Sequence, residues 1–122
     1  SKLIETLTSI CENYIKLKDI ENSKIVLEDI LSNIKDGDNR YLIQYYILKY
    51  RVHMLDGDLK EAENTLLLTL KFVKNLDYVR DAAEISIMLG KFYIDNGEEK
   101  EAAVYLNEGV SLFKKLGILK QI

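Results

Sequence analysis

The 122-residue sequence has no proline, one cysteine and one histidine, and each scarcity excludes something. Without proline, no helix meets the residue that breaks helices most strongly, so long helices are favoured. A lone cysteine, Cys11, cannot form an internal disulfide, so we expect a reduced cytoplasmic protein with Cys11 as a small buried residue. The apolar runs are far shorter than the ~20 residues that cross a bilayer, so no membrane insertion is expected.

The charge of the chain is balanced and evenly distributed. Seventeen Lys and Arg residues are interleaved with 20 Asp and Glu residues, which leaves a net charge of −3 and no basic stretch. Proteins that bind nucleic acid usually carry a basic patch or stripe, so direct nucleic-acid binding by this segment is not expected. Hydrophobic residues make up 48% of the chain, which is enough to form a folded core.

No arrangement typical of catalysis or metal binding is present. His53 has no cysteine or carboxylate cluster at ligand spacing, and we expect it to be packed in or near the core. Two Asp-Gly-Asp stretches, residues 36–38 and 56–58, lack the further oxygen ligands of a calcium loop and are interpreted as helix caps. Nucleophile elbows and glycine-rich phosphate loops are also missing, so we expect no enzyme activity and no cofactor.

A repeat of about 40 residues organises the chain. The segment RVHMLDGDLKEAENTLLLTL aligns with KFYIDNGEEKEAAVYLNEGV, which places Gly57 under Gly97 and Ala62 under Ala102, one repeat apart in both cases. A fainter copy, NYIKLKDIENSKIVLEDI, carries Ser23 at the position of the two alanines. The chain therefore contains about three copies of one unit.

Each unit is predicted to form two helices. Apolar residues recur at three- and four-residue spacing, are interrupted at Asn96-Gly97, and then resume, which indicates an antiparallel helical hairpin. Asp58 is predicted to cap one helix, with Glu61 reaching back to complete a capping box. The helices are expected near residues 2–17, 20–35, 39–55, 59–75, 78–95 and 98–115.

The small residues of the last unit are explained by close helix packing. Two antiparallel helices approach closely only where one of them lacks bulk, so Gly90 and Ala102 are interpreted as contact points. Tyr93 is expected to fill the space beside them. Four tyrosines between residues 41 and 50 are expected to belong to the core rather than to a ligand platform.

This pattern resembles the tetratricopeptide repeat. The last unit matches the pattern of that family at Leu89, Gly90, Tyr93, Gly97 and Ala102. The middle unit keeps its glycine and alanine but departs at Lys49, Tyr50 and His53, and the first unit keeps little beyond Tyr14 and Leu27. The resemblance implies an all-α fold, a right-handed superhelical stack of three antiparallel helical hairpins in one domain. The repeats are expected at residues 2–37, 38–76 and 77–116.

The long repeat period and the segment LFKKLGI (residues 112–118) resemble features of the intracellular peptide-pheromone receptors and related helix-turn-helix regulators of Gram-positive bacteria. This resemblance implies a non-catalytic peptide- or protein-binding module, the sensor part of a larger transcriptional regulator. The alternative is a structural scaffold in which the same surfaces bind a second copy of the chain, as a homodimer.

In stacked helical repeats, the first helix of each hairpin lines the concave face. We therefore expect a short peptide or a protein partner to contact one stripe on each of two helices, with Arg51 and Lys91 meeting anionic groups. An alternative is that the apolar members of both stripes only pack one repeat against the next. The predicted binding residues are Gln44, Ile47, Leu48, Arg51, Leu55, Glu84, Ile87, Met88, Lys91 and Asp95.

The two ends of the sequence indicate a piece of a longer protein. The chain starts at Ser1 without a methionine, and residues 117–122 resemble the start of a further helix after Gly117 stops the last one. We expect the parent protein to continue beyond Ile122, and residues 118–122 or a second copy to cover the apolar end of this segment.

Overall fold

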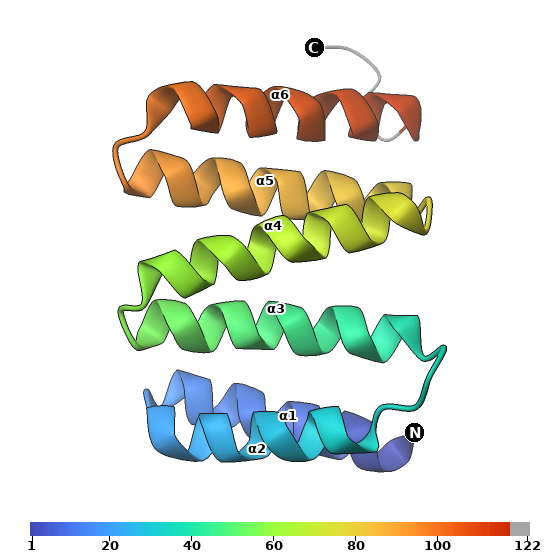
Figure 1. Ribbon diagram of the computed structural model, residues 1–122, viewed down its shortest axis with the longest axis vertical. Coiled ribbons are helices and arrows are strands. Elements are labelled where there is room, and N and C mark those ends of the chain that lie inside the picture. Colours follow the sequence, from blue (N-terminus) through green and yellow to red (C-terminus); the bar gives the residue numbers. More distant parts are fainter. Residues whose placement is uncertain (118–122) are drawn as a thin grey trace. The chain divides into compact units, whose positions relative to one another are not determined.

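The computed structural model describes residues 1–117 and contains six α-helices there, with no strand in that range (Figure 1). The all-α prediction is confirmed, and every predicted boundary lies within two residues of the observed one. No helix in the described range is long and apolar enough to cross a membrane. The helices are α1 (Lys2–Lys16), α2 (Ile20–Asn33), α3 (Asn39–Leu55), α4 (Leu59–Asn75), α5 (Val79–Asp95) and α6 (Glu99–Lys115).

The turn inside each helical pair shows the repeat in the backbone itself. Lys18, Gly57 and Gly97 all have positive φ angles, of 59°, 74° and 75°, and they follow one another at the period of the repeat. At Gly97, the backbone N–H donates to the Ile94 carbonyl at 3.0 Å, and the next N–H donates to the Tyr93 carbonyl at 2.8 Å. This paired bonding is the Schellman motif, which satisfies carbonyls that the helix end leaves free.

A second series of positive φ angles marks the junctions that follow α2, α4 and α6. Gly37, Asp77 and Gly117 have φ angles of 90°, 57° and 74° and are again separated by one repeat each. The predicted breaks near residues 36–38, 76–77 and 117 are therefore confirmed. The predicted structure of residues 118–122 lies outside the described residues.

Asp58 caps α4 as predicted, but the reciprocal half of the capping box is absent. The Asp58 carboxylate accepts from the Glu61 backbone N–H at 3.3 Å. The Asp58 backbone N–H, which a capping box would pair with the Glu61 side chain, donates instead to the His53 carbonyl at 3.0 Å. The Schellman turn around Gly57 has already used that donor.

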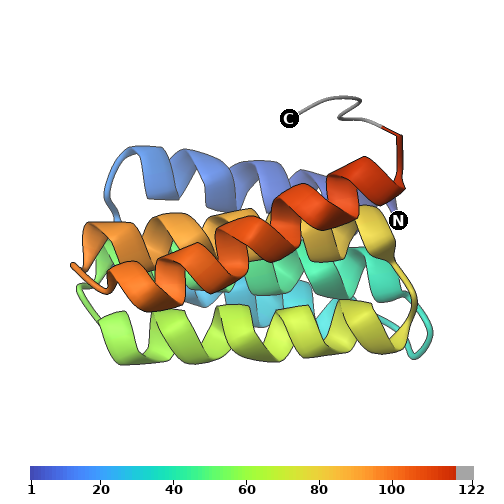
Figure 2. The ribbon, with the colours of Figure 1, turned by 90° about the horizontal axis from the view of Figure 1, so that it is seen from above.

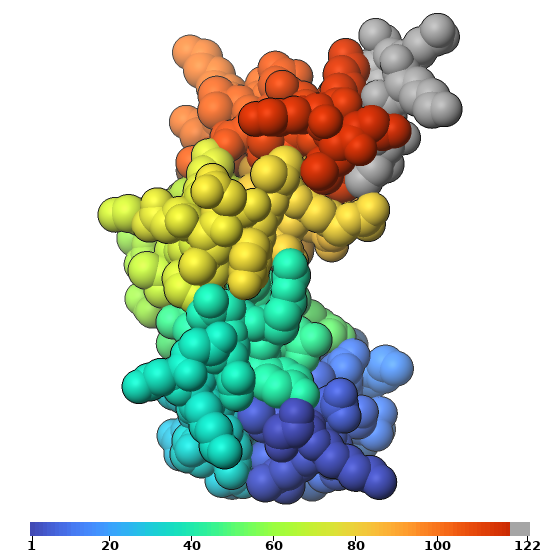
Figure 3. Space-filling view, turned by 90° about the vertical axis from the view of Figure 1, so that its right-hand side faces the viewer, coloured from blue at the N-terminus to red at the C-terminus, as the bar shows by residue number. Residues whose placement is uncertain are grey.

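The chain divides into two compact units, Ser1–Thr65 and Leu66–Ile122, and α4 crosses the boundary between them. In the first unit, α1, α2 and α3 all pack against one another. The first residues of α1 lie against the start of α3 (Figure 3), where the Ser1 amino group donates to the Tyr41 hydroxyl. The buried core consists of Ile4, Cys11, Val26, Leu27, Ile30, Tyr45, Leu48 and Val52.

Helices α1 and α2 approach each other at two small residues. Cys11 and Ser23 are both fully buried, and the Cys11 thiol lies 3.8 Å from the Ser23 carbonyl oxygen. The Ser23 hydroxyl donates to the Asp19 carbonyl at 2.6 Å, so its polar group is satisfied within its own helix. Ser23 thus occupies the buried position that Ala62 and Ala102 occupy in the later copies of the repeat.

In the second unit, α5 and α6 form a closely packed hairpin, with α6 crossing α5 at an angle in Figure 2. A methyl group added at Gly90 would lie 2.5 Å from Cγ of Leu106, so the predicted contact at Gly90 is confirmed. Tyr93 is buried, and its ring stacks on Tyr105 with 5.6 Å between the centroids. A second contact, at Gly109, was not predicted.

Candidate functional site

The predicted stripe on α3 lines a pocket of about 350 Å³ in the first unit. Four of its five members reach this pocket, and Leu55 at the end of the helix is not among the lining residues. The α3 residues are Gln44, Ile47, Leu48 and Arg51.

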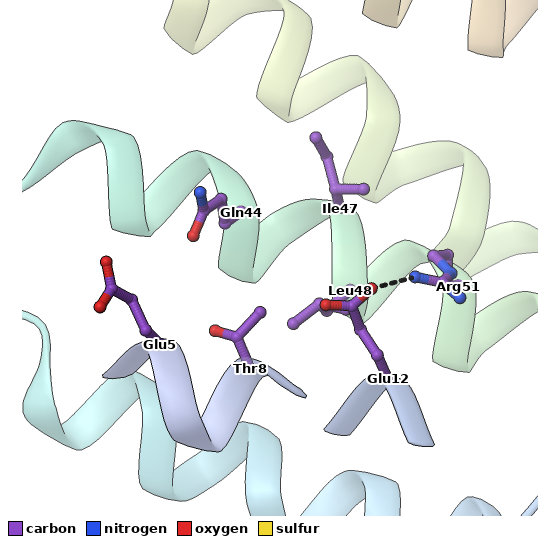
Figure 4. A pocket seen from close by; sticks show the side chains of 7 residues that line it. All are labelled: Glu5, Thr8, Glu12, Gln44, Ile47, Leu48 and Arg51. Carbon is purple, nitrogen blue, oxygen red and sulfur yellow. Dashed lines mark ion pairs between the residues drawn. The ribbon is translucent and has the colours of Figure 1, made fainter. Parts of the chain in front are cut away.

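The opposite wall of the pocket comes from α1, on which no binding residue was predicted. Glu5, Thr8 and Glu12 project from α1 toward α3 (Figure 4). Thr8 lies about one helical turn from Glu5 and from Glu12, so all three residues share one face of α1. The pocket is therefore a groove between two helices of the first unit.

The repeat register explains why these α1 residues lie there. Glu5, Thr8 and Glu12 occupy, one repeat earlier, the register positions of Gln44, Ile47 and Arg51. A shift of the predicted α3 stripe back by the offset between Tyr14 and His53 would have identified them. The first copy of the repeat matches the later copies at few positions, so its register is difficult to recognise in the sequence.

The ion pair across the pocket leaves it with an excess of negative charge. Nη1 of Arg51 lies 3.8 Å from Oε2 of Glu12, and the two side chains are 37% and 43% exposed. Glu5 is exposed and has no ion pair within the described part of the chain. Arg51 was expected to meet an anionic ligand, but it already has an acidic partner in the protein.

The apolar part of the pocket is shared with the core. Leu48 is only 4% exposed and belongs to the buried cluster between α1, α2 and α3. Ile47 is half-buried. The alternative that these residues pack the repeats together therefore holds for most of the Leu48 surface, whereas Ile47 keeps an accessible face.

The five predicted residues of α5 share one face of the helix, but they differ in how far they are exposed. Ile87 packs toward α6, because a methyl group added at Gly109 would lie 2.6 Å from Cδ1 of Ile87. Met88 is half-buried, whereas Glu84, Lys91 and Asp95 are exposed. Ile87 is thus drawn into the hairpin by the unpredicted gap at Gly109.

The reactive side chains lie in packed positions. Cys11 is fully buried, and this burial raises the pKa of its thiol from 9.0 to about 11, although the charge of Arg51 acts in the opposite direction. His53 is half-buried, and its Nε2 atom has no hydrogen-bond partner among residues 1–117. That same range contains no group of three side chains that could hold a metal ion.

The two Asp-Gly-Asp stretches act locally, as parts of turns and helix ends. Asp38 occupies the cap position of α3 without a side-chain cap bond, and Asp58 caps α4. Asp56 ends α3 and forms an ion pair with Lys24 of α2, with 2.8 Å between the charged atoms. Their interpretation as helix caps is thus confirmed in full only for Asp58.

Comparison of the chain with family models, with curated proteins and with solved structures finds no match. The helices, the register of the repeat and the geometry of the pocket are therefore the features from which a function can be inferred.

Proposed function

We propose that the chain is a tetratricopeptide-like segment in which three antiparallel hairpins form a right-handed superhelical stack. Two regularities support this proposal. Positive φ angles recur once per repeat in each of two interleaved series, and a small buried residue recurs at Ser23, Ala62 and Ala102. Each repeat thus has a left-handed turn and a small buried residue at the same register positions, as expected of a solenoid built from one unit.

The proposed function is the non-catalytic binding of a short peptide or a protein segment. The observation that carries it is the pocket between α1 and α3, lined by the same register positions of two successive repeats. Its volume of about 350 Å³ is at the lower end of the range of ~300–1,000 Å³ typical of ligand pockets. It would therefore hold one or two side chains of an extended peptide rather than a folded domain.

The proposal is tested by titrating ¹⁵N-labelled protein with a pool of capped pentapeptides and following the backbone amide signals. Binding at the proposed site shifts the amides of residues 5–12 and 44–51. Ile47→Glu should remove these shifts, because it places a charge on the accessible apolar wall. Ile25→Glu is the matched control, since Ile25 is 53% exposed on α2 and outside the pocket. If no peptide shifts the two segments at millimolar concentration, the pocket has no such function.

A larger role as the sensor part of a transcriptional regulator stays a prediction from the resemblance. The sequence of the parent open reading frame tests it, because a helix-turn-helix domain should precede this segment. A parent without any DNA-binding domain would contradict it.

Self-association is a second candidate, favoured by an apolar stripe on α1. Leu3 and Ile10 on α1 and Leu17, the residue that follows the helix, are 53%, 39% and 75% exposed and recur at every seventh position. At 100° per residue Leu3 and Ile10 share one side of α1, roughly opposite the pocket residues. Light scattering after size-exclusion chromatography should show a dimer that Ile10→Lys dissociates. A monomer at high concentration would exclude this candidate.

A further inference from the structure

The charge of the pocket indicates what kind of peptide it accepts. Three ionisable side chains line it, the carboxylates of Glu5 and Glu12 and the guanidinium of Arg51. Arg51 is paired with Glu12, so Glu5 is the ionised group that a ligand meets without displacing a partner. An anionic ligand would have to separate Glu12 from Arg51 and also approach Glu5.

The neutral polar side chains of the pocket are compatible with a cationic ligand. Gln44 and Thr8 line the groove beside Glu5, and each has an oxygen that can accept a hydrogen bond from an ammonium or guanidinium group. Ile47 and the exposed edge of Leu48 supply an apolar wall within the same pocket. A ligand that satisfies both parts needs a positive charge next to an aliphatic side chain.

We propose that this pocket binds a peptide segment in which a Lys or Arg residue is adjacent to an aliphatic residue. This inference rests on the proposed peptide-binding function of the same pocket. The basic side chain meets the Glu5 carboxylate, Arg51 stays paired with Glu12, and the aliphatic side chain packs on Ile47. The charge of the ligand is thus selected by α1 and its apolar contact by α3.

The test uses the full chain and three capped pentapeptides that differ at one position. The probes are acetyl-Gly-Leu-Lys-Leu-Gly-amide and the same peptide with norleucine or glutamate in place of lysine. Affinity is measured from the amide shifts of residues 5–12 and 44–51 at low and high salt. We expect the lysine peptide to bind about two- to fivefold more tightly than the norleucine peptide, as is typical of a partly exposed ion pair. The glutamate peptide should bind most weakly, and the differences should shrink at high salt.

Two charge-neutralising variants make the test specific. Glu5→Gln removes the unpaired carboxylate with little change of shape. The affinity of the lysine peptide should therefore fall toward that of the norleucine peptide. Glu84→Gln is the matched control, because Glu84 is exposed at the equivalent register position of α5, outside this pocket. This control variant should behave like the unmodified protein.

The possible failures are distinguishable. If the glutamate peptide binds most tightly and shifts the same residues, the charge inference is wrong while the peptide-binding function stands. If all three peptides bind equally, the charge inference is again wrong. If none shifts these residues, both proposals fail. Lys71 and Lys74 line a separate pocket between α4 and α6. If the lysine and glutamate peptides both shift the amides of these two residues equally, the peptides bind there without regard to their charge, and the inference is also wrong.

Discussion

The close contact between α5 and α6 at Gly90 can be tested by adding a single methyl group. In Gly90→Ala, the new carbon would lie 2.5 Å from Cγ of Leu106 and 3.3 Å from the Leu106 backbone nitrogen. The first distance is about 1 Å shorter than the ~3.5 Å of normal carbon contacts. The Leu106 side chain or the helix itself must therefore move.

Two opposing effects determine how Gly90→Ala changes the free energy of unfolding. Alanine is favoured over glycine inside a helix by about 1 kcal/mol, whereas overpacking a close contact costs about 1–3 kcal/mol. We therefore expect Gly90→Ala to leave the free energy of unfolding unchanged or to lower it by up to about 2 kcal/mol. In a Leu106→Ala background the obstructing side chain is gone, so the same change should raise that free energy by about 1 kcal/mol.

The assay is urea unfolding followed by circular dichroism in the far ultraviolet for the unmodified protein, the two single variants and the double variant. The coupling free energy of the cycle should be about 1–3 kcal/mol, because the added methyl group is harmful only when Leu106 is present. If Gly90→Ala stabilises the protein equally in both backgrounds, the two helices do not approach closely at Gly90 and the reasoning is refuted.

Three further predictions concern the turns, the thiol and the ion pair. In urea unfolding, Lys18→Gly should stabilise the protein by about 0.5 kcal/mol, because it removes the cost of a lysine in the left-handed conformation. Gly97→Ala should destabilise the protein by about 1 kcal/mol for the opposite reason, and equal effects of the two substitutions would contradict this explanation. The pKa of Cys11 is raised from 9.0 to about 11, so the unfolded state loses its proton first, and the free energy of unfolding should fall between pH 9 and 11 more steeply than in Cys11→Ala. Parallel pH profiles of the two proteins would disprove this. A double-mutant cycle of Glu12→Gln and Arg51→Met should give a coupling free energy of at most ~1 kcal/mol that weakens with salt, because both side chains are partly exposed. A coupling free energy that does not change with salt would contradict this prediction.

The helices were predictable because two kinds of signal coincide in the sequence. Apolar residues recur at the helical period, and glycines or Asp-Gly pairs stand where that period stops. Gly57 and Gly97 mark their turns directly. Lys18 and Asp77 adopt the same left-handed conformation without glycine. The break at Leu76-Asp77 was predicted, whereas only its distance from the glycine turns identifies Lys18.

Side-chain directions were harder to predict than helices, because they depend on which neighbour leaves space. Gly90 was interpreted correctly as a contact point. Gly109 was overlooked, and the gap that it leaves on α6 accommodates Ile87, which had been placed in a binding stripe. In α3, Arg51 was placed in the stripe that lines the pocket, but its partner Glu12 could not be found without applying the repeat to α1.

The divergence of the first repeat has a consequence for the charge of the pocket. The register position of Glu12 holds Arg51 in the second repeat and Lys91 in the third, and the position of Glu5 holds Gln44 and then Glu84. If α1 carried a cation at residue 12, as the later repeats do, it would face Arg51 with like charge and repel it. The acid at residue 12 instead allows α1 and α3 to form an ion pair across the groove, and Glu5 then supplies the remaining negative charge. The helix with the faintest repeat signal is thus the one that determines which ligand charge this pocket favours.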